Sequence, residues 1–199
     1  MMLNHETLQR RNRSKNKALI TGTVTVFILF FLFWEHLHGG VASHHILQQQ
    51  NLPVISNWWS GLLLPILTWL LLGRTEKRFD KKSSQGYQTN ILQSYVLKLF
   101  ITGLALGVLI AVSFANGYSP FLDNVPYIIL MLSLIIPIYY SEFILGFILG
   151  MTYTFGAILP TLFILILAAI GLLIYRFIKP VMIMLAMKLI SKLNKSLNR

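Results

Sequence analysis

Long apolar runs separated by short polar segments make up most of this chain. Predominantly apolar stretches lie at residues 18–37, 91–115 and 125–178, and a shorter one lies at 58–73. A helix needs roughly 20 such residues to cross the hydrocarbon core of a bilayer, and the alternating polarity of a membrane β-barrel is absent. The pattern therefore predicts an all-α fold, a multi-pass transmembrane helical bundle.

The stretch 125–178 is too long for a single crossing. Two breaks divide it, PIYYSE at 137–142 and GMTYTFGAILP at 150–160. The resulting segments lie near 125–141, 143–158 and 159–178. Either all three cross as short spans, or the first two form a re-entrant hairpin, whose non-helical turn must then be buried in protein or line a cavity. Both interpretations give about six hydrophobic helices, the second as four spans plus the hairpin.

The distribution of charge predicts the orientation. The 17 Lys and Arg fall in three blocks, at 10–17, 74–82 and 176–199, with Lys98 as the exception. The second block belongs to an expected cytoplasmic loop, 73–90, because basic segments stay inside. We therefore expect a multi-pass protein of the plasma (inner) membrane with both termini cytoplasmic. Since this accounts for the net charge of +11, we expect no nucleic-acid partner.

The same pattern divides the chain into three parts. Residues 1–17 form a basic cytoplasmic segment, 18–179 a single transmembrane domain, and 180–199 an amphipathic helix that follows Pro180. Cations and leucines recur every three or four residues on different faces of that helix. The cations are Lys188, Lys192, Lys195 and Arg199, and the leucines are Leu185, Leu189, Leu193 and Leu197. We expect the helix to lie on the lipid bilayer with its cations near anionic lipids.

The first apolar run is expected to remain as a membrane span. GVAS at 40–43 has the small residues of a signal-peptide cleavage site, but polar Glu35 and His36 would stand before the cut. The run is also longer than the roughly 7–15 residues of the apolar core of a secretory signal.

The segment FWEHLHGGVASHH, residues 33–45, holds four of the five histidines. Neutral imidazole is the commonest nitrogen ligand of transition metals, and one carboxylate lies beside these rings. The five donors are Glu35, His36, His38, His44 and His45. They predict an outward-facing site for a transition metal ion or a proton-linked polar ligand, provided that the first helix ends by about residue 37. The alternative is a hydrated turn whose histidines contact water, lipid headgroups and backbone carbonyls.

Several other kinds of site are excluded. The chain has no cysteine, so a metal would be held by nitrogen or oxygen alone. It lacks the HExxH motif of zincins, the several histidine boxes of membrane di-iron oxygenases, and a mid-span histidine for a haem. Nucleophile elbows and phosphate-binding loops are also missing, which favours a function other than catalysis.

Glu142 is the second candidate residue, because ionisable groups inside hydrophobic segments are costly and usually functional. In the hairpin interpretation it lies at depth beside Tyr139, Tyr140 and Ser141, where it binds a proton, a cation or a cationic substrate. In the three-span interpretation it lies at the cytoplasmic rim and pairs with a lysine.

Three functions remain open. The leading hypothesis is metal or proton-linked ligand binding at the outward His/Glu site. The first alternative is a small transporter or solute-capturing membrane subunit that uses the carboxylate of Glu142. The second is a structural or assembly subunit that binds a membrane-protein partner, or another copy of itself, through Gly146 and Gly150. That small-xxx-small pattern more often indicates close helix packing than a ligand site.

Overall fold

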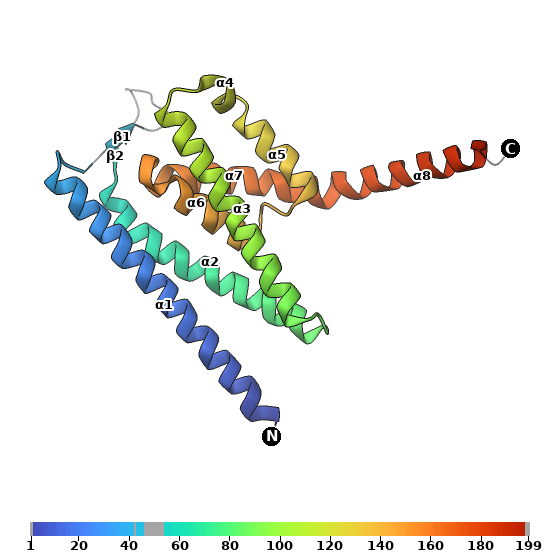
Figure 1. The fold of residues 1–199 in the computed structure, drawn as a ribbon, viewed down its shortest axis with the longest axis horizontal. Coiled ribbons are helices and arrows are strands. Elements are labelled where there is room, and N and C mark those ends of the chain that lie inside the picture. The colour runs from blue at the N-terminus through green and yellow to red at the C-terminus, as the bar shows by residue number, and fades with distance from the viewer. Residues whose placement is uncertain (1, 42, 46–53, 198–199) are drawn as a thin grey trace.

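The structure, a computed structural model, describes residues 2–41, 43–45 and 54–197, including the side chains of 12–41, 43, 56–188 and 190. Its elements are, in chain order, α1 (Met2–Leu37), β1 (Ser43–His45), β2 (Val54–Ser56), α2 (Trp58–Ser84), α3 (Thr89–Ala115), α4 (Ser119–Leu122), α5 (Val125–Ile135), α6 (Ser141–Phe155), α7 (Ile158–Leu173), the π-helical turn η2 (Ile174–Ile178) and α8 (Lys179–Leu197). Figure 1 shows a mainly helical chain with one β-hairpin, in which β1 and β2 pair as antiparallel strands. The predicted helical class is confirmed.

Three helical stretches are long and apolar enough to cross a membrane: Asn12–Leu37, Thr89–Ala115 and Ile158–Lys188. α5 and α6 are apolar but shorter. The apolar part of α2 ends at Arg74, where the second basic block begins. The chain is therefore a membrane-associated helical protein.

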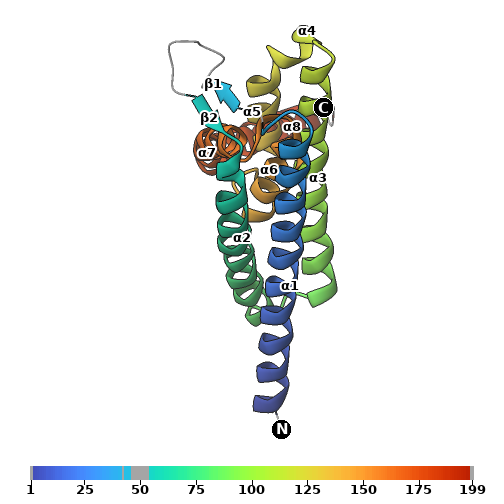
Figure 2. The same ribbon diagram turned by 90° about the vertical axis from the view of Figure 1, so that its left-hand side faces the viewer.

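The helices α1 and α2 both extend well beyond the expected spans. The basic N-terminal segment continues as the first turns of α1, and α2 runs on to Ser84 through residues that the sequence assigned to a loop. Figures 1 and 2 both show α1 and α2 side by side, with the N-terminus at the end opposite the hairpin. Lys, Arg, Glu and Gln are good helix formers, so their charge marks the edge of the membrane rather than the end of a helix.

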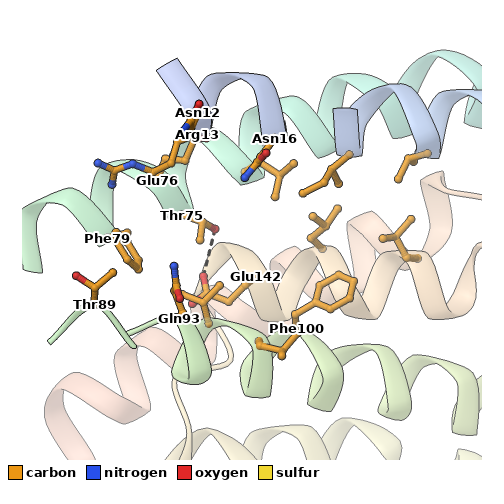
Figure 3. Close-up of a pocket in the computed structure, with 17 residues that line it drawn as sticks. Asn12, Arg13, Asn16, Thr75, Glu76, Phe79, Thr89, Gln93, Phe100 and Glu142 are labelled. Atoms are coloured by element: carbon orange, nitrogen blue, oxygen red, sulfur yellow. Dashed lines mark hydrogen bonds between the residues drawn. The ribbon is translucent and has the colours of Figure 1, made fainter. Parts of the chain in front are cut away.

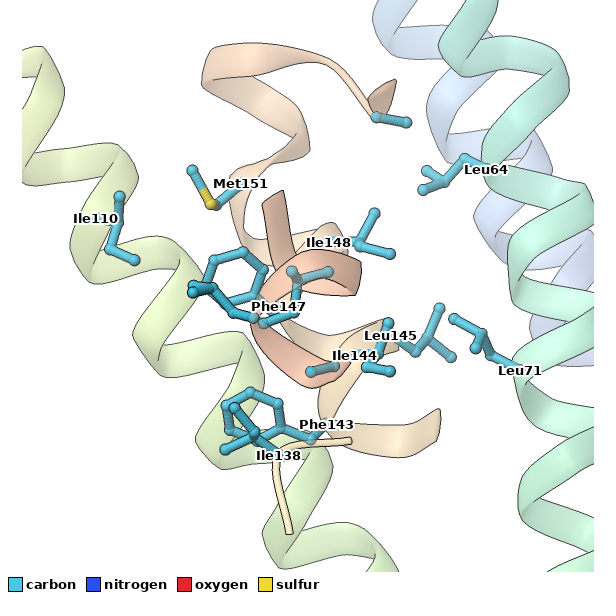
Figure 4. Packing of buried hydrophobic residues seen from close by; sticks show 14 of the residues in the cluster. Leu64, Leu71, Ile110, Ile138, Phe143, Ile144, Leu145, Phe147, Ile148 and Met151 are labelled. Carbon is cyan, nitrogen blue, oxygen red and sulfur yellow. The ribbon is translucent and has the colours of Figure 1, made fainter. Parts of the chain in front are cut away.

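α6 lies at the centre of the molecule. Every residue from Glu142 to Ile148 is buried, and the helix packs against α3, α2 and α7. Figure 4 shows its apolar side chains, among them Phe143, Phe147 and Ile148, surrounded by those of neighbouring helices. A short helix is thus stabilised by contacts on all of its sides.

α3 and α6 approach each other through glycines. A Cβ atom on Gly146 would overlap the backbone oxygen of Phe100 and lie 2.8 Å from the backbone nitrogen of Leu104. Gly103 meets the backbone of α6 in the same way. The prediction of close packing is confirmed, and the partner helix belongs to the same chain. A separate assembly partner would have to use another surface.

The second pair of glycines, Gly107 and Gly150, continues this seam one turn farther along each helix, backbone against backbone. The four glycines Gly103, Gly107, Gly146 and Gly150 are called the glycine seam below.

The two predicted breaks are present but narrower than expected. Residues 136–140 separate α5 from α6, because Ile136 precedes Pro137 and is extended, with φ −120° and ψ 147°. Only Gly156 and Ala157 separate α6 from α7. Gly156 has φ +68° and ψ −173°, a backbone conformation that side chains disfavour.

α6 lies antiparallel to α2. At one end Glu142 contacts Thr75 and Arg78, and just beyond the other end the N–H of Ala157 donates to Ser60 Oγ at 2.8 Å. Ser60 and Thr75 are separated by about 22 Å along α2 at 1.5 Å per residue. α6 therefore covers most of the apolar length of α2.

The helix predicted at 180–199 corresponds to α8, Lys179–Leu197, but Pro180 does not separate it from the preceding span. α7, η2 and α8 follow one another without a break, and α8 begins at Lys179. A proline lacks the N–H of the helical ladder and its ring crowds the preceding turn. Here that turn is the wider π-helical η2, which accommodates the proline without ending the helix. α8 projects away from the bundle (Figure 1).

Candidate functional site

The outward His/Glu segment begins where the sequence predicts. α1 ends at Leu37, and Gly39 and Gly40 turn the chain with φ +122° and +99°. His38 Nδ1 lies 2.9 Å from the backbone oxygen of Trp34, and its ring stacks on that indole at 3.8 Å between centroids. This imidazole keeps only Nε2 available for a ligand.

The remaining donors are only partly placed. His36 is exposed, with its ring 6.0 Å from that of Trp58, and Glu35 has a buried Oε2 without a hydrogen bond in the described residues. His44 and His45 belong to β1, but their side chains lie outside the described residues. Among the side chains that the structure describes, no three His, Asp or Glu come together as metal ligands.

Glu142 lies in the first turn of α6 with 4% of its side chain exposed. It forms an ion pair with Arg78, and its Oε2 lies 3.3 Å from Thr75 Oγ1, whose one hydroxyl proton is shared with the backbone oxygen of Leu71 at 3.1 Å. Its charge also lies at the N-terminal end of a helix, where the macrodipole stabilises an anion. The buried carboxylate is therefore fully compensated.

The residues that precede Glu142 hold Arg78 in place. The guanidinium lies 3.7 Å from the ring centroid of Tyr140, within the range of a cation–π interaction. Tyr139 makes edge contacts with Tyr140 and with Tyr175. Ser141 is the first residue of α6 and is half-buried. The three predicted supporting residues thus belong to the same corner as the ion pair.

A cavity of about 770 Å³ opens on the other side of this ion pair (Figure 3), bounded by α1, α2, α3 and α6. Its volume lies within the roughly 300–1,000 Å³ of small-molecule sites. Glu142 and Thr75 both line it, whereas Arg78 does not.

The cavity has one polar end and one apolar end. The polar lining consists of Asn12, Arg13, Asn16, Thr75, Glu76, Thr89, Gln93 and Glu142. The apolar lining consists of Ile20, Val24, Leu72, Phe79, Val96, Leu97, Phe100, Leu145 and Leu149. On each of the four helices the polar residues lie toward the end that carries the basic blocks, and only Phe79 departs from this order.

Two of the charged groups at the polar end are neutralised within the chain. Arg13 forms an ion pair with Asp80, and Glu142 forms one with Arg78. Glu76 has neither an ion pair nor a hydrogen bond among the described residues. Burial raises its pKa, although the nearby ammonium of Lys17 partly opposes the shift.

The amide side chains Asn12, Asn16 and Gln93 likewise have no hydrogen-bond partner in the described part of the chain, and all three are exposed. Figure 3 labels these amides together with Glu76 and Glu142 among the side chains that line the cavity. The polar end therefore offers an unpaired carboxylate and several amides to a bound molecule.

Sequence reasoning missed this end of the cavity. Its residues on α1 and α2 belong to segments that were assigned to a basic terminus and a loop, so they were not considered as site residues. One signal was present: Asn12, Asn16, Ile20 and Val24 recur every four residues on one face of a helix, and the face changes from polar to apolar along its length.

Comparison with known protein families, characterised proteins and solved structures gave no match for this chain.

Proposed function

We propose that this chain is an integral membrane protein that captures or transports an amphipathic solute, which binds in the cavity between α1, α2, α3 and α6. The carrying observation is the common polarity of the four helices that line it. A hydrocarbon chain fits among the apolar walls, and a polar group fits at the end near the basic blocks. The lining spans about 17 Å on α3, from Thr89 to Phe100, at 1.5 Å per residue.

Glu142 has a supporting part in this function. Its carboxylate borders the cavity and is held by Arg78 and Thr75, so it contributes a fixed polar group to the cavity wall. Removing a partner from a buried ion pair is costly. The pair therefore connects the cavity wall to the corner formed by Tyr139 and Tyr140.

We infer the membrane topology from the same contacts. In the three-span interpretation, which the ion pair between Arg78 and Glu142 favours, α5 crosses together with residues 136–140, and α6 and α7 cross as short spans. This gives six hydrophobic helices, with Glu142 at the cytoplasmic rim beside the second basic block. Both termini are then cytoplasmic, in the plasma membrane. A single cysteine at Ser141, labelled with a membrane-impermeant thiol reagent from each side, tests this: labelling from outside alone contradicts it.

The absence of native cysteine makes a sharp binding test possible. Val96→Cys places a thiol in the cavity, and Ser94→Cys places one at the same depth on α3 outside the lining. In proteoliposomes, dodecyl amphiphiles should slow alkylation of Val96→Cys by N-ethylmaleimide and leave Ser94→Cys unchanged. Equal effects at both positions for every amphiphile would exclude the cavity as a binding site.

α8 completes the proposal as a lipid-facing helix. Its described side chains include exposed apolar residues such as Met182, Leu185 and Ile190, and further lysines follow along the chain. We expect these cations to bind anionic headgroups of the inner leaflet. Thiol labelling of Met187→Cys should become slower when phosphatidylglycerol is added to neutral liposomes, and no change would contradict the contact.

A second candidate function is metal or proton-linked ligand binding at the outward segment. The observation in its favour is the end of α1 at Leu37, the geometry that such a site requires. Elemental analysis of purified protein tests it: bound metal should fall in His44→Ala and His45→Ala, and a metal content that neither substitution alters removes the hypothesis.

A further inference from the structure

The polar end of the cavity suggests the kind of headgroup that the solute carries. This inference rests on the proposed function, since it concerns the same cavity. A hydrocarbon chain gains little by moving from the bilayer into the cavity, because lipid tails are as apolar as leucine side chains. Selectivity must therefore come from the headgroup and the polar residues that meet it.

Glu76 is the charged group left available there. Arg13 is neutralised by Asp80, and Glu142 by Arg78, whereas Glu76 lines the cavity without an ion pair in the described residues. Lys17 is the cation that most strongly favours the charged form of Glu76. It forms no ion pair with Glu76, and its ammonium lies 3.9 Å from the ring centroid of Trp69.

The amides complete the environment of Glu76. Asn12 and Asn16 from α1 and Gln93 from α3 face the same polar end. An amide both donates and accepts hydrogen bonds, so these three groups accommodate polar atoms of either kind. The carboxylate accepts only, so among these groups without an ion pair in the described residues it is the one that favours a cation over an anion.

We propose that the cavity binds a single-chain amphiphile with a protonated amine headgroup, and that the Glu76 carboxylate accepts hydrogen bonds from that amine. The hydrocarbon chain lies along Val96, Leu97 and Phe100 of α3 toward Leu145 and Leu149 of α6. α1 packs along α2 and makes no extensive contact with α3 in the described part of the chain. The amphiphile therefore enters from the bilayer between α1 and α3.

The experiment compares dodecylamine, dodecanol and dodecanoate as protectants of Val96→Cys against N-ethylmaleimide in proteoliposomes. These probes share one chain and differ only in the headgroup. Dodecylamine should protect at an about tenfold lower concentration than either of the others, the effect of one hydrogen bond to a charged group. Glu76→Gln in the same background should abolish that preference, and Glu76→Asp, which keeps the carboxylate, should retain it.

The outcomes separate the inference from the proposed function. Protection by dodecanoate at an equal or lower concentration, or an amine preference that survives Glu76→Gln, overturns the inference while leaving the cavity as a binding site. Failure of all three probes to protect Val96→Cys overturns the proposed function itself. The alkylation rate without any amphiphile is measured for Val96→Cys with and without Glu76→Gln. Equal rates are expected and would show that the substitution leaves the cavity formed.

Discussion

The two sides of α3 pack in opposite ways. Toward α6 the glycine seam brings backbone against backbone, so that not even a methyl group fits. Toward α1, α3 presents Val96, Leu97 and Phe100 to an open cavity. The burial of the two helices agrees with this difference. In the 18-residue apolar stretch of each helix, 11% of the residues are buried in α1 and 33% in α3.

This difference follows from side-chain size. Without a hydrophobic force between helices in lipid, association depends on close van der Waals contact, which small residues permit. α6 has two glycines facing α3, whereas α1 has Ile20 and Val24 at the corresponding level of the cavity. The chain thus packs α3 closely against α6, whereas α1 is held by α2 and makes no extensive contact with α3 in the described residues. A binding site with lateral access requires such an arrangement.

The largest effect is expected from breaking the seam. Gly146→Leu places a side chain where the backbone of Phe100 and Leu104 already lies, so we expect loss of the folded protein. Overpacking of well-packed cores typically costs about 1–3 kcal/mol, and a collision with backbone cannot be relieved by a side-chain rotation. Gly22→Leu is the control, since Gly22 has nothing within 4 Å of its Cβ position. Yield and thermal unfolding in detergent measure both, and equal stability of the two variants would contradict the seam.

The next effect concerns the ion pair that borders the cavity. Arg78→Met leaves Glu142 buried without its partner and should lower the free energy of unfolding by about 3 kcal/mol, at the lower end of the range for broken buried pairs. In Arg78→Met/Glu142→Met most of that loss should return, because no uncompensated charge remains. Chemical unfolding of the four members of this double-mutant cycle provides the measurement. Additive losses would show that the two residues are not coupled.

The sequence predicted the parts of this comparison that depend on hydrophobicity. α3 was predicted at 91–115 and begins two residues earlier, at Thr89. The break between α5 and α6 was predicted at 137–142 and lies at 136–140, where proline restricts the residue before it. Gly146 and Gly150 were identified as packing residues, but their partners on α3 were not, since spacing along one helix does not show which helix it faces.

The site was harder to predict because it depends on contacts between distant segments. Glu142 was recognised as a carboxylate within a hydrophobic segment, and a lysine partner was expected in the three-span interpretation, but the observed partner is Arg78, 64 residues away. Glu76 was overlooked because it lies among basic residues in a segment taken for a loop. Charged residues mark where a helix leaves the membrane, but the helix itself can continue beyond them. On α1 and α2 the polar end of the cavity is formed by these continued parts of the helices.

A smaller effect separates two neighbouring residues of α6. Ile148 is fully buried in the core, whereas Leu149 lines the cavity. Ile148→Phe should cost about 1–3 kcal/mol through overpacking, and Leu149→Phe should cost less, because its ring enters empty space. Leu149→Phe should in turn weaken the protection of Val96→Cys by dodecyl amphiphiles. Thermal unfolding and the alkylation assay measure the two effects, and equal destabilisation by both substitutions would show that the cavity is closed.

The smallest effect, a pH dependence, concerns Glu76. Burial raises the pKa of this carboxyl from 4.5, so the folded protein binds its proton more tightly than the unfolded chain does. The free energy of unfolding is then highest below pH 4.5 and falls as the pH rises through the raised pKa. Glu76→Gln should therefore melt slightly higher than the parent at pH 7, and this difference should shrink toward pH 4. A lower melting temperature for Glu76→Gln at pH 7 would mean that the carboxylate is stabilised in the empty cavity.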